Sequence, residues 1–207
     1  MSTLSMGSSR IWLNTGNPGL SETDAEQGNL WLNTTTGRIF GCSDDTFGSQ
    51  VWLSAAGMGG LVQQVSTQTT TYTNVTATIP YDDTIPQNTE GTEIMSVAIT
   101  PTSATNKLLI FSTVTGSHSN VLTSILIRSL FQDSTANALA TVAISTDSGY
   151  WDNSALQYSM TAGTTSSTTF KIRVGCNLNG FEVNGQGGSR KFGGAPVCAL
   201  TVMEISA

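Results

Sequence analysis

The residues that most often carry out catalysis are sparse in this chain. Its single histidine, His118, lies in the polar segment Gly-Ser-His-Ser-Asn at 116–120. A Ser–His–Asp triad needs a histidine that a carboxylate holds and that faces a nucleophile. Serines surround His118 because serine is abundant here, and no Gly-x-Ser-x-Gly segment occurs. We therefore interpret His118 as a polar loop tip that contacts a ligand or a neighbouring subunit.

The carboxylates form only small clusters, which are Asp44-Asp45, Asp82-Asp83 and Glu90 with Glu93. A glycosidase needs two carboxylates across a cleft, and adjacent residues such as Asp82 and Asp83 tend to point apart. A bound Ca²⁺ takes about six to eight oxygen ligands, which one acidic pair does not supply. We expect solvated turn acids, with a cation at Asp82-Asp83 as the alternative. The sequence predicts no catalytic residues, no metal site and no cofactor.

The three cysteines, Cys42, Cys176 and Cys198, are an odd and widely spaced set. This spacing favours neither a disulfide framework nor a Cys-x-x-Cys metal clip. Small buried residues are the preferred interpretation. A pairing of Cys176 with Cys198 on neighbouring strands stays open.

Two other segments combine aromatic and short polar side chains. Tyr81 precedes Asp82-Asp83, and Tyr150-Trp151 precedes Asp152. Aromatic rings stack on sugars while polar neighbours supply hydrogen bonds. We predict that Tyr81, Asp82, Asp83, Tyr150 and Trp151 contact a ligand, together with His118. The alternative for Trp151 is a position in the core.

Composition indicates a β protein that does not bind nucleic acid. Charged residues make up 11% of the 207 residues, against roughly a quarter in a typical soluble domain. Threonine, serine and 21 glycines take their place, which favours pleated strands and turns. The net charge is −6, and the 8 Lys and Arg residues are scattered. No basic stripe exists to neutralise phosphates.

The chain contains no apolar run of the ~18 residues that a membrane helix needs. Its first residues, MSTLSMGSSRIW, lack the charged and apolar regions of a signal peptide. We expect a protein that is made in a cytoplasm and is not inserted in a membrane.

The first 60 residues contain a loose tryptophan repeat: Ile11-Trp12-Leu13-Asn14, Leu30-Trp31-Leu32-Asn33 and Val51-Trp52-Leu53. Each copy reads as a short strand, and 29–40 is typical of a hairpin with Trp31 on one face and Leu30 and Leu32 on the other. So small a module is expected to bury its tryptophans against other subunits or another protein; a self-contained small core is the alternative. Residues 54–60, rich in Gly and Ala, would join this module (1–57) to a second domain (58–207).

After residue 61 the pattern is one of strands and turns. The predicted strands include a long Thr/Val alternation at 62–79, buried apolar strands at 107–114 and 197–205, and an ambiguous segment at 121–132 that we assign as a strand. Asn179-Gly180 and Asn184-Gly185 predict tight turns. The fold class is therefore all-β, with an N-terminal β-hairpin module and an antiparallel, jelly-roll-like sandwich.

Two stretches resemble known bacteriophage proteins. GNLWLNTTTGRIFGCSDD at 28–45, continuing to Val51-Trp52, is similar to short β modules of phage fibre and other virion proteins. IPYDDTIPQNTEGTE at 79–93 leads into MSVAITP at 95–101, and FGG at 192–194 and LTVMEI at 200–205 follow later. These segments resemble the C-terminal β domain of phage and prophage tail-fibre-like proteins.

The resemblance implies a homotrimer with three jelly-roll-like domains around an axis. It implies a non-enzymatic virion protein that is attached to tail, portal-vertex or major capsid proteins through Trp12, Trp31, Phe40 and Trp52. The leading hypothesis is a short trimeric fibre or tip protein whose C-terminal domain binds a host-surface glycan. Because the chain has almost no shaft, a capsid decoration (cement) protein is the alternative. A glycan-cleaving enzyme is the third hypothesis.

Overall fold

The structure is a computed structural model, which describes residues 2–6, 9–19, 26–35, 38–54, 60–118, 124–147, 149–178 and 180–207. The prediction of an all-β protein is confirmed, since no α-helix occurs in these ranges. The chain forms two compact units, Met1–Gly60 with Ser206 and Leu61–Ile205 with Ala207. The joint expected at Gly57 falls in 55–59, outside the described residues. In the described ranges no helix has the length and apolarity needed to cross a membrane.

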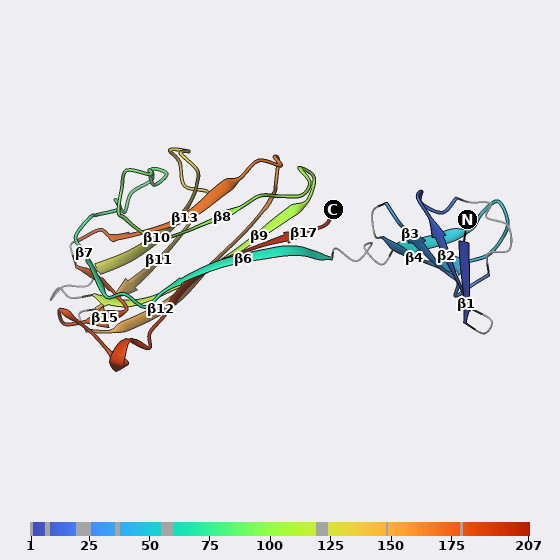
Figure 1. Ribbon diagram of the computed structural model, residues 1–207. Coiled ribbons are helices and arrows are strands. Elements are labelled where there is room, and N and C mark those ends of the chain that lie inside the picture. The colour runs from blue at the N-terminus through green and yellow to red at the C-terminus, as the bar shows by residue number, and fades with distance from the viewer. Residues whose placement is uncertain are drawn as a thin grey trace. The chain divides into compact units, whose positions relative to one another are not determined.

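The first unit is one five-stranded sheet in the order of the chain (Figure 1). Strands β2 and β3 are parallel, and the other neighbouring pairs are antiparallel. The hairpin expected at 29–40 corresponds to β3 and β4. The strands are β1 (Ser2–Met6), β2 (Ser9–Asn14), β3 (Leu30–Asn33), β4 (Ile39–Asp44) and β5 (Val51–Ser54).

The second unit has two antiparallel sheets whose inner faces share one apolar core (Figure 1). One sheet has the order β6-β17-β9-β12, with β14 and β7 continuing beside the far end of β9. The other has the order β11-β10-β13-β8. The first sheet contains β6 (Leu61–Thr69), β7 (Thr73–Val75), β9 (Lys107–His118), β12 (Trp151–Thr161), β14 (Phe181–Val183) and β17 (Cys198–Ile205). The second contains β8 (Thr92–Ile99), β10 (Ser124–Gln132), β11 (Ala140–Thr146) and β13 (Thr168–Cys176).

The core of the second unit is lined by every second residue of its strands. Alternate residues of β17, namely Cys198, Leu200 and Val202, are buried with Leu108 and Ile110 of β9. The strands at 107–114 and 197–205 were expected to be buried. Instead each has one buried and one partly exposed face, because their sheet packs on only one side along this stretch. The segment 124–132 is a strand as predicted, and 121–123 lies outside the described residues.

Two local predictions are wrong. The alternation at 62–79 is not one strand, because β6 ends at Thr69 and β7 begins at Thr73. The Asn184 amide donates to the backbone oxygens of Thr69 and Thr71, and so holds the bend between them.

The second wrong prediction concerns His118, which is not at a loop tip. It is the fully buried last residue of β9, where it pairs with Phe181 of β14.

Two short elements complete the second unit. β15 (Gly185–Gln186) and β16 (Ser189–Arg190) form a small hairpin, and a 3₁₀ turn spans Phe192–Gly194. Asn184 has a φ of 56°, so the turn predicted at Asn184-Gly185 is present. Asn179 lies outside the described residues.

Candidate functional site

The four aromatic residues expected to attach the first unit lie together within it. The rings of Trp12 and Trp31 stack with centroids 5.7 Å apart, and Trp52 meets Trp31 edge-on at 5.8 Å. Phe40 packs in the same cluster, and Trp31 Nε1 donates to the Gly16 oxygen at 2.9 Å. The expectation that these tryptophans need another chain for burial is therefore wrong. They form a small core of their own, in which Trp12, Trp31 and Phe40 are buried and Trp52 is partly buried.

The opposite face of the same sheet is aliphatic. Leu30 pairs with Ile11 and Gly41, and Leu32 pairs with Leu13 and Ile39. Paired residues share a face, so these side chains lie opposite the tryptophans. Leu30 and Ile39 are exposed. The alternation in Leu-Trp-Leu was the sequence signal for this second face.

The outer face of the sheet β6-β17-β9-β12 is free of charge along three rows of paired residues. Every residue in these rows is polar and uncharged or apolar, and Phe111, at 37% exposed, lies on the middle row. The rows are Gln64–Met203–Leu109–Ser159, Ser66–Thr201–Phe111–Gln157 and Gln68–Ala199–Thr113–Ala155. The other sheet differs, since Glu93 there lies within 4 Å of Lys171 and Arg173.

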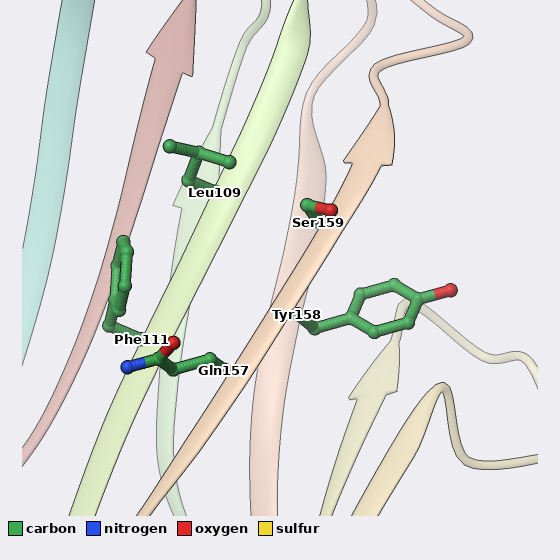
Figure 2. Close-up of a pocket in the computed structure, with 5 residues that line it drawn as sticks. All are labelled: Leu109, Phe111, Gln157, Tyr158 and Ser159. Atoms are coloured by element: carbon green, nitrogen blue, oxygen red, sulfur yellow. The ribbon is translucent and has the colours of Figure 1, made fainter.

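A shallow hollow of about 190 Å³ lies on this face beside Phe111. Leu109 and Phe111 of β9 line it with Gln157 and Ser159 of β12, whereas the Tyr158 ring points away toward the core side (Figure 2). The face thus offers both a protruding ring and a recess next to it.

A second hollow, of about 400 Å³, lies at the Trp151 end of the same sheet. Trp151 and Phe192 form its aromatic corner, with ring centroids 5.8 Å apart and planes inclined at 56°. Thr115 and Asn153, which pair across β9 and β12, supply polar groups. Residues 195–197 complete the lining. We call this hollow the aromatic groove.

The side chain of Trp151 is fixed by hydrogen bonds. Its Nε1 donates to Gln186 Oε1 at 3.0 Å, and Gln186 Nε2 in turn donates to the Gly149 oxygen. Trp151 is half-buried and therefore belongs partly to the fold and partly to the surface. Tyr150 beside it is exposed. The sequence did not single out Phe192 as a ligand residue; the signal available was an aromatic residue before two glycines.

The loop with Tyr81, Asp82 and Asp83 lies away from the aromatic groove. Their loop precedes β8 on the side of the other sheet, and Asp82 and Asp83 line a shallow hollow with residues 138–141. Hydrogen bonds from the Thr84 hydroxyl and backbone N–H to Asp82 lower the pKa of that carboxyl. In the described ranges no group of three or more His, Cys, Asp or Glu is arranged to hold a metal ion.

The buried end of the second unit holds polar groups that serve the fold. Arg128 and Asp152 form a buried ion pair, and the Arg128 guanidinium lies 5.2 Å from the Phe181 ring centre.

The cysteines predicted to be small buried residues are buried. Burial raises the pKa of the Cys198 and Cys176 thiols. In the described part of the chain Cys42, Cys176 and Cys198 form no disulfide, so Cys176 and Cys198 are not paired with each other. His118 is buried here as well, so its side chain does not reach the exposed surface.

Comparison with known proteins gives little. No family model matches the chain, and no curated protein matches it. Among solved structures, dimeric latent PorU from Porphyromonas gingivalis aligns with 71% of this chain and 13% of that chain, at 8% identity and a TM-score of 0.31. A similarity of this size supports no inference about function.

Proposed function

We propose that this protein is a non-enzymatic structural protein of a bacteriophage virion and acts as a homotrimer. The observation that carries the proposal is the set of three uncharged rows on the outer face of β6-β17-β9-β12, with Phe111 at its middle. Residues that lie on a threefold axis meet copies of themselves, so a charge on the axis would meet like charges. A face that combines an exposed ring, a recess and uncharged polar groups suits such packing.

The strand order supports the proposed fold. Strands β6, β9, β12 and β17 lie in one sheet and β8, β10, β11 and β13 in the other. The chain therefore passes repeatedly between sheets, as in a jelly roll of two Greek keys. The resemblance of residues 79–101 to tail-fibre-like domains agrees with this arrangement.

The first unit is the proposed attachment module. Its tryptophan cluster gives it a folded core, and its aliphatic face with Leu30 and Ile39 would bind a tail, vertex or capsid protein. The second unit would then face outward and bind the host surface. In this scheme the module stays folded while it presents an apolar surface to the virion.

A charge at the proposed trimer axis tests the assembly. Phe111→Glu is expected to convert a trimer into monomers, measured by multi-angle light scattering of the full chain. Tyr81→Glu is the matched control, because Tyr81 is also an exposed aromatic residue but lies on the side of the other sheet. A monomeric wild-type protein, or a trimer that survives Phe111→Glu, would refute the proposed assembly.

The alternative is a capsid decoration protein. The two units follow each other at residues 60 and 61, which leaves no segment for a long shaft between them. Copy number separates the two functions, because a cement protein needs hundreds of copies and a fibre a few dozen at most. Quantitative mass spectrometry of purified virions measures this number. In either case Leu30→Asp with Ile39→Asp is expected to abolish incorporation and leave the trimer intact.

A further inference from the structure

We infer that the aromatic groove binds a neutral pyranose of a host-surface glycan, an inference that rests on the proposed host-binding function. Its lining contains no charged side chain: Thr115, Trp151, Asn153, Phe192 and residues 195–197 are all uncharged. Arg190 and Lys191 precede Phe192 in the chain and are not among the lining residues, although the Arg190 guanidinium lies beside Gly194. The lining therefore contains no cation that could pair with the carboxylate of an acidic sugar. A neutral sugar needs no such partner and is not penalised by its absence.

The two rings offer a sugar two different contacts. Because the planes of Trp151 and Phe192 are inclined at 56°, one ring can stack on the apolar face of a pyranose while the other borders its edge. Phe192 is 77% exposed, which leaves its face open to a ligand. A volume of about 400 Å³ matches the lower part of the range for small-ligand sites, roughly 300–1,000 Å³.

The groove is organised before any ligand arrives. Trp151 is held through Gln186 to the Gly149 backbone. Phe192 has a φ of 48°, a conformation that a bulky residue rarely adopts, and Gly193 and Gly194 follow it with φ of 65° and 91°. The backbone strain at Phe192 costs free energy, although its ring is exposed to solvent. We take this strain as a sign that the position of the ring is functional. Since hydrogen bonds already hold the Trp151 side chain, binding would not have to immobilise it.

Polar groups lie where sugar hydroxyls would reach them. Thr115 and Asn153 pair across β9 and β12, and both side chains point to the outer face. They lie four residues along their strands from Phe111 and Gln157, a separation of about 13 Å. The groove is therefore displaced along the sheet from Phe111, which lies at the middle of the proposed trimer face.

The test uses the full-length chain and saturation-transfer NMR with a panel of neutral methyl pyranosides, N-acetylglucosamine, and one sialylated and one phosphorylated sugar. Host cells are tested in parallel by pull-down. We expect a neutral pyranose to bind. Phe192→Ala and Asn153→Ala should each weaken it by ~10-fold without changing Tm, while Tyr81→Ala has no effect.

The outcomes separate the two proposals. The groove assignment is overturned by preference for an acidic sugar, by unchanged affinity in Phe192→Ala and Asn153→Ala, or by loss of binding in Tyr81→Ala alone. If cells are still bound in any of these cases, host attachment stands and only the groove fails. A wild-type protein that binds neither sugars nor cells refutes both.

Discussion

Trp12 and Trp31 lie directly opposite each other on the parallel strands β2 and β3, and their rings stack 5.7 Å apart. The neighbouring pairs are Ile11 with Leu30, Leu13 with Leu32 and Asn14 with Asn33. The two repeats in the sequence are thus aligned in register. Like side chains meet along both faces, so the repeat builds one aromatic and one aliphatic layer.

Trp31→Ala is expected to unfold the first unit. Trp31 is almost completely buried at the centre of the cluster, contacting both Trp12 and Trp52. Loss of so large a core side chain costs about 3–5 kcal/mol, which a sheet of this size cannot replace. Near-UV circular dichroism and calorimetry should show loss of the first unit's transition and an unchanged transition for the second.

Phe47→Ala is the control for this experiment, because Phe47 is also aromatic, lies in the first unit and is 68% exposed. Its stability should stay within about 0.5 kcal/mol of wild type. A Trp31→Ala protein that melts like wild type would show that the tryptophan cluster does not hold the unit together.

Asp152→Ala is expected to destabilise the second unit by about 3–5 kcal/mol, because it leaves a buried charge without its partner. Arg128 is buried between the two sheets, and among the described residues its Nε and Nη1 have no hydrogen-bond partner. Burial lowers the pKa of Arg128, and Asp152 opposes that change. Chemical denaturation of the full chain measures the effect.

The double variant Arg128→Met with Asp152→Ala provides the matched comparison. Removing both charges eliminates the unpaired ion, so the double variant should recover at least half of the loss. If the double variant is as unstable as the sum of the two single variants, the pair does not act as a unit.

Glu204→Gln is expected to lower stability at neutral pH and to flatten the acid side of the stability profile. Glu204 is buried at the opposite end of the core. Burial by itself raises the pKa of its carboxyl, but hydrogen bonds from Gln63, Asn106 and Thr102 outweigh this and lower the pKa from 4.5 to about 2.

A pKa lower in the folded state means that the ionised carboxylate stabilises the fold. This contribution is complete above pH 4.5 and is lost as the pH falls to about 2; we expect about 2 kcal/mol, allowing for solvent screening. Urea denaturation at pH 7 and at pH 2 should show a clear difference between Glu204→Gln and wild type at pH 7 that shrinks at pH 2. A constant difference would contradict the prediction.

The sequence alone determined the fold class and most of the strands. Period-2 alternation and β-branched residues are local signals, so they identified β3, β4, β9, β10 and β17 without knowledge of their partners. The scarcity of catalytic residue types also followed from composition. Burial was harder to predict, because it depends on what covers a strand. His118 has polar sequence neighbours, yet it is buried because β14 pairs with the end of β9.

Tertiary structure decided which residues meet. Nothing local to Trp151 and Phe192, 41 positions apart in the sequence, predicts that their rings approach to 5.8 Å. The same holds for the uncharged face, whose rows combine residues of β6, β17, β9 and β12 through long-range pairing. A sequence pattern records which face of a strand is apolar. Only the pairing of distant strands determines which faces join into a surface or a groove.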